Sequence, residues 1–141
     1  MPLYPTREKI INNPLIHKKE AVKTVKKWKE KVWKPIRKSD NRQKKFEALE
    51  ILAKKLGKTY NNPIGSVTYN ENAPTCSYNP ITKTIAINGS LSIISTLHEF
   101  AHHLHGHSEL KACRWSIYMF KSVFPEAFKK LKWKRHMLVR Q

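Results

Sequence analysis

The sequence predicts an α+β protein, and three observations support that fold class. Apolar residues recur at every third or fourth position in several stretches, which is the period of a helix with one buried face. Two short runs rich in β-branched residues, 66–70 and 83–88, predict strands. Proline residues and an Asn-Gly dipeptide mark turns between these segments. We therefore expect helices at both ends of the chain and a small antiparallel sheet in the middle, packed on a central helix.

Two helices are predicted in a basic N-terminal region, residues 1–60. The first extends from about Lys18 to Lys34, before Pro35, and the second from about Asp40 to Leu56, with Gly57 as its terminator. The apolar stripe of the first helix consists of Ala21, Val25, Trp28 and Val32, and that of the second consists of Phe46, Leu49, Ala53 and Leu56. Residues 61–141 would contain the strands, the central helix and a basic C-terminal helical tail. We expect both parts to form one compact domain.

The segment between Ser90 and Gly106 predicts the central helix. Ser90 or Ser92 can accept hydrogen bonds from the first unpaired backbone N–H groups, and glycine suits the position after the last turn. The helix contains the pattern His-Glu-x-x-His, at residues 98–102. Two histidines four positions apart lie one turn above each other, so both can bind one metal ion. Buried histidines are also ordinary polar core residues, but the intervening glutamate and the capped helix favour a metal site.

The role expected for Glu99 follows from its position in the helix. It projects about 100° around the helix axis from His98, where it can reach a water on the metal without binding the metal itself. The run from Ile85 to Ala112 resembles the catalytic core of small zincin metallopeptidases, and within them the SprT-like proteins and the ImmA/IrrE group. This resemblance implies a zincin-like fold, a Zn2+ cofactor bound by His98 and His102, and hydrolysis of a protein or peptide substrate with Glu99 as general base. His103, Tyr78 and Tyr118 are candidates for assisting the carbonyl oxygen.

Two residues are candidates for the third zinc ligand. Ser108 can cap a second helix that Glu109 opens, and a short turn would fold this helix back towards His102. The Glu-x-x-Ala start of that helix resembles the gluzincin arrangement, in which this glutamate binds the metal. His107 follows Gly106, as the third histidine follows a glycine in metzincins, but the spacing differs from the metzincin pattern. We favour Glu109, with His107 as the alternative.

Charge is distributed unevenly along the chain. The net charge is +18, and basic residues gather before residue 61 and after residue 110, so the central block is close to neutral. Lysines interleaved with tryptophans can bind nucleic-acid backbones and stack on bases. The candidates for this contact are Lys26, Lys27, Lys130, Lys134 and Arg135. Such charge runs also commonly just solvate a surface. Asp40 is the only aspartate, which argues against a magnesium nuclease site built on clustered carboxylates.

These features leave two alternatives to a metallopeptidase that acts on free substrates. One is a nucleic-acid-associated SprT-like protein that cuts DNA-bound proteins, and the other is a non-catalytic binding module stabilised by a metal. No apolar run is long enough to span a membrane, and no secretory signal is recognisable. Cys76 and Cys113 are too few for a disulfide framework. We expect a cytoplasmic protein, encoded by a phage or mobile element or associated with the nucleoid.

Overall fold

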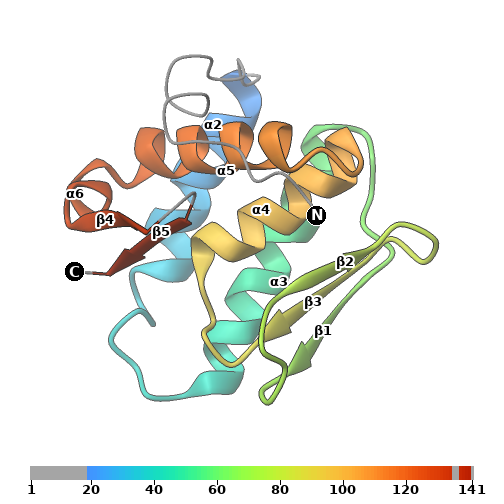
Figure 1. Cartoon of the computed structure of the whole chain (residues 1–141). Coiled ribbons are helices and arrows are strands. Elements are labelled where there is room, and N and C mark those ends of the chain that lie inside the picture. Colours follow the sequence, from blue (N-terminus) through green and yellow to red (C-terminus); the bar gives the residue numbers. More distant parts are fainter. Residues whose placement is uncertain (1–18, 135–136, 141) are drawn as a thin grey trace.

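Two neighbouring helices, α4 (Ile93–His105) and α5 (Glu109–Val123), form the centre of the fold. The computed structural model describes residues 19–134 and 137–140, with side chains as far as residue 132. In Figure 1, α4 and α5 lie side by side between a small sheet at the lower right and a strand hairpin at the left. Both helices contribute to one main hydrophobic core, together with α2, α3 and the sheet. Among the helices of the described ranges, none has the length and apolar character needed to cross a bilayer.

The first predicted helix is present, but its second half is wound differently. Helix α2 (Lys19–Trp28) is α-helical and buries Ala21, Val25 and Trp28 of the predicted stripe. The last residue of the stripe, Val32, lies in η1 (Lys29–Trp33), a π-helical turn, and is only half-buried. Trp28 is fully buried, donates a hydrogen bond from Nε1 to the Ala48 carbonyl at 2.7 Å, and stacks on the Trp33 ring. This tryptophan is therefore a core residue and is not available for stacking on nucleic-acid bases.

The second predicted helix, α3 (Arg42–Thr59), starts later and ends later than expected. Asn41 is its N-cap, because the Asn41 side chain accepts a hydrogen bond from the Lys44 N–H. The prediction that Gly57 ends this helix is wrong, since the helix continues through it to Thr59. A Cβ atom on Gly57 would lie 3.0 Å from the Asn62 carbonyl oxygen and 3.1 Å from the Ile64 nitrogen. The glycine is needed for this close approach of the following chain rather than for helix termination.

The sheet is mixed, and the expectation of an antiparallel sheet is wrong for one of its two pairings. Strands β1 (Ser66–Asn70) and β3 (Thr84–Asn88) confirm the two predicted strands, and they run parallel. The third strand, β2 (Ser77–Asn79), forms a hairpin with β3 and pairs with it in antiparallel register. Strand β3 therefore lies between β1 and β2, and the strand order is β1-β3-β2. The central strand β3 is the most buried, and β2 lies at an edge.

The C-terminal region is also different from the helical tail that we expected. Helix α5 is followed by a short helix, α6 (Pro125–Lys129), and then by the antiparallel hairpin of β4 (Leu131–Lys134) and β5 (Met137–Arg140). The proline occupies the first turn of α6, where its missing N–H costs nothing. After Lys130 the apolar residues alternate with lysines, which is the strand period rather than the helix period.

Candidate metal centre

Helix α4 positions the two histidines and the glutamate of the His-Glu-x-x-His pattern. The Ser92 hydroxyl accepts a hydrogen bond from the Ser95 N–H at 3.2 Å, and Gly106, with φ of 77°, follows the last turn. Both caps agree with the sequence. The buried face of the helix consists of Thr96, Leu97, Glu99, Phe100 and Ala101. Anchoring this face in the core leaves the imidazole rings of His98 and His102 one turn apart in an edge-to-face arrangement, with ring centroids 4.9 Å from each other.

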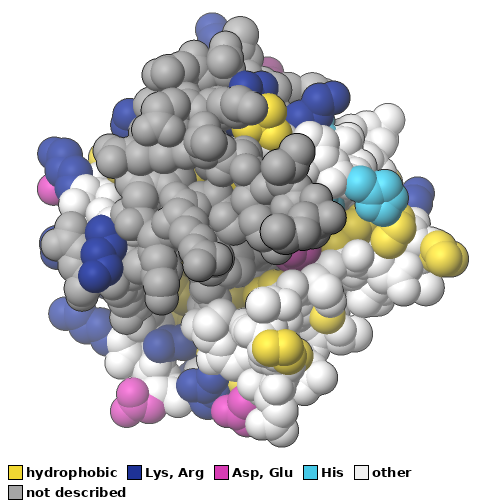
Figure 2. Space-filling model, in the orientation of Figure 1, with side chains coloured by type: hydrophobic (Ala, Val, Ile, Leu, Met, Phe, Trp, Pro, Cys, Tyr) yellow, Lys and Arg dark blue, Asp and Glu magenta, His cyan; other side chains and the backbone are white. Residues whose placement is uncertain are grey.

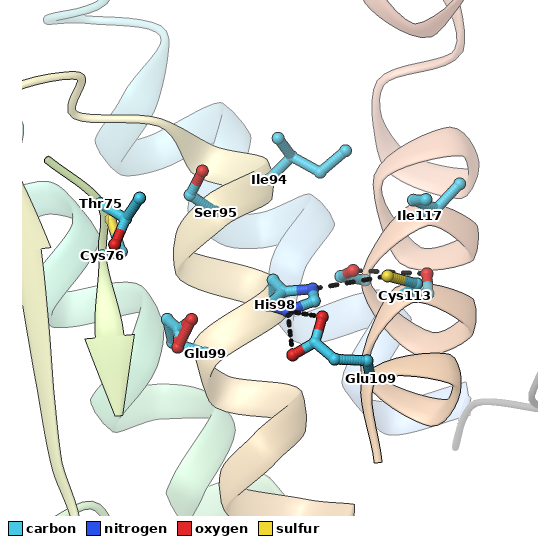
Figure 3. A pocket seen from close by; sticks show the side chains of 10 residues that line it. Thr75, Cys76, Ile94, Ser95, His98, Glu99, Glu109, Cys113 and Ile117 are labelled. Atoms are coloured by element: carbon cyan, nitrogen blue, oxygen red, sulfur yellow. Dashed lines mark hydrogen bonds and ion pairs between the residues drawn. The ribbon is translucent and has the colours of Figure 1, made fainter. Parts of the chain in front are cut away.

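Helix α5 brings Glu109 to these two rings. Ser108 caps α5 by accepting a hydrogen bond from the Lys111 N–H, so Glu109 is its first residue. A glutamate Oε1 lies 2.7 Å from His102 Nε2, and Oε2 lies 3.2 Å from His98 Nε2 (Figure 3 shows the His98 contacts). One carboxylate therefore contacts both imidazoles, as the short turn between the helices led us to expect. The alternative candidate, His107, is exposed in that turn.

The hydrogen bonds of His102 make its Nε2 atom suited to binding a cation. Its Nδ1 lies 2.7 Å from the Gly106 carbonyl oxygen, which can only accept, so Nδ1 carries the proton. In the neutral ring Nε2 then presents a lone pair to the Glu109 carboxylate, which is also an acceptor. A proton or a metal ion must lie between them. The Glu109 hydrogen bond accordingly raises the pKa of His102, and the two histidines hold the pKa of Glu109 far below its usual range.

The donor atoms of this cluster are of the types that bind metal ions. Two imidazole nitrogens and one carboxylate oxygen form the ligand set of one class of catalytic zinc sites. The hydrogen bond from His102 to a backbone carbonyl is the kind of support that fixes the orientation of a metal-binding histidine. Donor atoms of His98, Glu99 and His102 lie within 4.8 Å of one another, so this group can hold a metal ion. The residues present are therefore compatible with the zinc that the sequence pattern implies.

Cys113 belongs to the same cluster, which the sequence analysis did not foresee. Its thiol sulfur lies 4.0 Å from Nδ1 of His98, and donor atoms of His98, Glu109 and Cys113 also lie within 4.8 Å of one another. Burial raises the pKa of the Cys113 thiol to about 12, so the thiol is protonated at neutral pH in the metal-free protein. A signal was present, because Cys113 follows Glu109 by four residues on a helix and must share its face.

Glu99 lies on the opposite side of His98 from α5 (Figure 3). It lines two cavities. Its side chain is largely buried, and this burial raises the pKa of its carboxyl group, against the opposing effect of the two histidines. The first cavity, of about 240 Å³, extends between α4 and α5, and the second, of about 340 Å³, lies beside β2. A carboxylate at the junction of two cavities can reach a molecule bound in either of them.

A hydrogen-bonded chain holds Tyr78, one of the residues proposed to assist the carbonyl oxygen. His103 Nε2 donates to the Asn62 carbonyl oxygen at 2.8 Å, so in the neutral ring Nδ1 accepts from the Tyr78 hydroxyl at 2.6 Å. Tyr78 and Glu99 line the same second cavity. The third candidate, Tyr118, lies on α5 with 40% of its surface exposed. Of the three, Tyr78 is placed beside Glu99, and His103 holds it there.

The predicted nucleic-acid contacts whose side chains the structure describes are Lys26, Lys27 and Lys130, and none of these three is among the residues of the metal cluster. Lys26 and Lys27 are exposed on α2, and Lys130 is exposed after α6. The side chain of Lys134 and the whole of Arg135 lie outside the described residues. Figure 2 shows most of the visible Lys and Arg side chains at the left and lower left of this face, and few over the sheet on the right. Exposed lysines are therefore present on α2 and after α6, where the sequence placed candidate nucleic-acid contacts.

The chain has no recognised relative in the comparisons with known proteins. No protein-family model matches it, and no curated protein and no solved structure resembles it closely enough to count as a match. The likeness to zincins therefore rests on the residues of α4 and α5 themselves. What the structure supports is a mixed α+β fold that carries a His-Glu-x-x-His group able to hold a metal ion.

Proposed function

We propose that this protein is a zinc-dependent metallopeptidase, in which Glu99 acts as general base for the hydrolysis of a peptide bond. The observation that carries the proposal is the carboxylate of Glu109, which contacts the Nε2 atoms of both His98 and His102 from a second helix. Zinc held by these three side chains would supply the Lewis acidity that polarises water and the peptide carbonyl.

The environment of Glu99 suits a general base. Efficient proton transfer requires a pKa close to the working pH, and burial moves the pKa of this carboxyl group upwards from its ordinary value. Its position beside the cavities allows it to take a proton from the attacking water and to pass that proton to the leaving amine. The Tyr78 hydroxyl lines the same cavity and is placed to donate a hydrogen bond to a substrate oxygen when it rotates away from His103.

The free edge of β2 supports a peptide as the substrate. This strand pairs with β3 on one side only, and the described strands leave its other edge without a partner. Ser77 and Tyr78 of β2 line the second cavity together with Glu99 and His102. An extended peptide can pair with an unpaired edge through its main chain, so a substrate on β2 would run past Glu99. The strand that contains Ile85, β3, pairs with β1 on one side and with β2 on the other, so it has no free edge for a peptide.

The test compares Glu99→Gln with Glu126→Gln, an exposed control on α6. Zinc content is measured by elemental analysis, and proteolysis is followed with a labelled unfolded protein. Wild type and both variants should retain about one zinc per chain, while Glu99→Gln should lose roughly 100-fold or more in turnover, because general base catalysis contributes that much. Normal proteolysis by Glu99→Gln would exclude the assigned role. Absence of both zinc and proteolysis in the wild type would exclude the function.

The third ligand is identified by the same measurement on two further variants. Glu109→Ala should lose zinc, because its carboxylate contacts both imidazoles, whereas His107→Ala should retain it. The opposite result would make His107 the ligand and would leave Glu109 as a hydrogen-bond partner of the histidines.

A further inference from the structure

The cavity between α4 and α5 has two ends of different chemistry. Its polar end contains His98, Glu99 and Glu109, the residues of the candidate centre. The other end is formed by Ile94 of α4 with Cys113 and Ile117 of α5. Figure 3 shows Ile94 and Ile117 on the side of His98 away from Glu109. The cavity therefore leads from the reacting groups into an apolar recess.

The charged residues among those that the structure describes around this cavity, Glu99 and Glu109, belong to its polar end, so the recess itself has no described counter-charge. No lysine, arginine or aspartate is among the described residues that line the cavity. Ser116, which also lines it, uses its hydroxyl proton within α5 by donating to the Ala112 carbonyl at 2.7 Å. The Cys113 side chain is almost fully buried. An ionised group in this recess would lose its hydration without gaining a counter-charge, which is strongly unfavourable.

The volume of the cavity limits the size of what it can hold. An apolar cavity of about 150 Å³ lined by aliphatic and aromatic side chains can bind benzene. The cavity here measures about 240 Å³, which leaves room for one side chain of the size of leucine, methionine or phenylalanine. It is too small for a folded segment or a nucleotide, since sites for such ligands begin at about 300 Å³.

The position of the cavity relates it to the bond that would be cleaved. Cys76, Glu99 and Glu109 line both this cavity and the one beside β2. A peptide that lies along β2 and passes Glu99 therefore has the recess beside the residue that adjoins its reacting bond. We propose that this recess binds an apolar side chain next to the cleaved bond, so that the protein selects leucine, methionine or phenylalanine at that position and rejects charged residues. This inference rests on the function proposed above.

The first experiment digests a peptide mixture with the zinc-loaded protein and identifies the cleavage sites by mass spectrometry. Matched peptides that differ only beside the cleaved bond then give kcat/KM for leucine, phenylalanine, alanine, lysine and glutamate. We expect leucine and phenylalanine to be preferred over lysine and glutamate by at least about tenfold, the range that side-chain pockets supply. Cleavage without this preference overturns the inference and leaves the proposed function standing. If no peptide is cleaved, both the inference and the proposed function are overturned.

Two variants change the size of the recess in opposite directions. Ile94→Phe should narrow it and shift the preference towards alanine by about tenfold, and Ile117→Ala should widen it and favour larger aromatic residues. Ile81→Phe is the control, because Ile81 is 90% exposed and does not line the cavity. Thermal unfolding checks that each variant is folded. If both cavity variants change kcat/KM by the same factor for all peptides, the recess does not select the side chain.

Binding provides a readout that does not depend on turnover. The same peptides, fluorescently labelled, are titrated against Glu99→Gln and followed by anisotropy. Their order of affinity should match the order of kcat/KM in the wild type, and Ile94→Phe in the Glu99→Gln background should weaken the leucine peptide more than the alanine peptide. Equal affinity for the leucine and lysine peptides would contradict the proposed recess.

Discussion

Replacing Glu109 by glutamine tests the cluster in the metal-free protein, before any catalysis is considered. Glu109 has a hydrogen bond of 2.7 Å with His102 and a longer contact of 3.2 Å with His98. A hydrogen bond that involves a charged group contributes about 1.5–3 kcal/mol, and solvent screening reduces this value for a side chain that is 36% exposed. We therefore expect Glu109→Gln to lower the free energy of unfolding by about 1–2 kcal/mol, or roughly 3–6 °C in Tm.

The loss should depend on pH in a defined direction. The pKa of Glu109 is lowered from 4.5, so its contribution is present above pH 4.5 and disappears as the pH falls through the lower folded value. The pKa of His102 is raised from 6.5, so its contribution is complete below pH 6.5 and disappears as the pH rises through the higher folded value. The stability gap between wild type and Glu109→Gln should therefore be largest between pH 4.5 and 6.5.

The assay is thermal unfolding followed by circular dichroism in the presence of a chelator, at pH values inside this window and on both sides of it. Glu126→Gln serves as the control, because the side chain of Glu126 is 81% exposed. If the difference in Tm between wild type and Glu109→Gln stays constant across the pH range, the ion pair between Glu109 and His102 is refuted. Added zinc should then raise the Tm of the wild type by several degrees and that of Glu109→Gln by less, since a ligand that binds only the folded state stabilises it.

Two further predictions concern the packing that supports the site. Trp28→Phe leaves the buried Ala48 carbonyl without its hydrogen-bond donor and removes ring volume from the core. The free energy of unfolding, measured by urea denaturation, should therefore fall by about 2–4 kcal/mol. A decrease below about 0.5 kcal/mol would contradict the importance of that hydrogen bond. Gly57→Ala should destabilise the protein by about 1–3 kcal/mol, because the added methyl group meets the Asn62 and Ile64 backbone at 3.0–3.1 Å. The helix propensity of alanine opposes this loss by about 1 kcal/mol, so a more stable Gly57→Ala variant would show that the backbone moves aside easily.

Features set by neighbouring residues could be predicted from the sequence. The caps at Ser92 and Ser108, the turn at Gly106 and the approach of Glu109 to His102 all depend on a few adjacent positions, and the structure has them. The two strands rich in β-branched residues were found for the same reason. Their periodicity and caps are local signals that do not require knowledge of distant contacts.

Features set by distant contacts could not be predicted in this way. The parallel pairing of β1 with β3 depends on how the hairpin of β2 and β3 docks, and β2 has too few residues to show a period. Gly57 looked like a helix terminator because glycine often is one, but its role depends on the chain at residues 62–64. The cavity between α4 and α5 likewise depends on how two helices pack, and no local pattern specifies it.

The cluster itself is assembled from a very short stretch of chain. His98, His102, Glu109 and Cys113 all lie on one helical hairpin, joined by the turn around Gly106. Closing a loop of this length takes only about 10–100 ns, so the hairpin can form, and can bind metal, early in folding. The cavities next to it need Cys76 and the sheet, which come from a different part of the chain. Metal content therefore tests whether the hairpin is formed, and formation of the cavities beside it has to be measured separately.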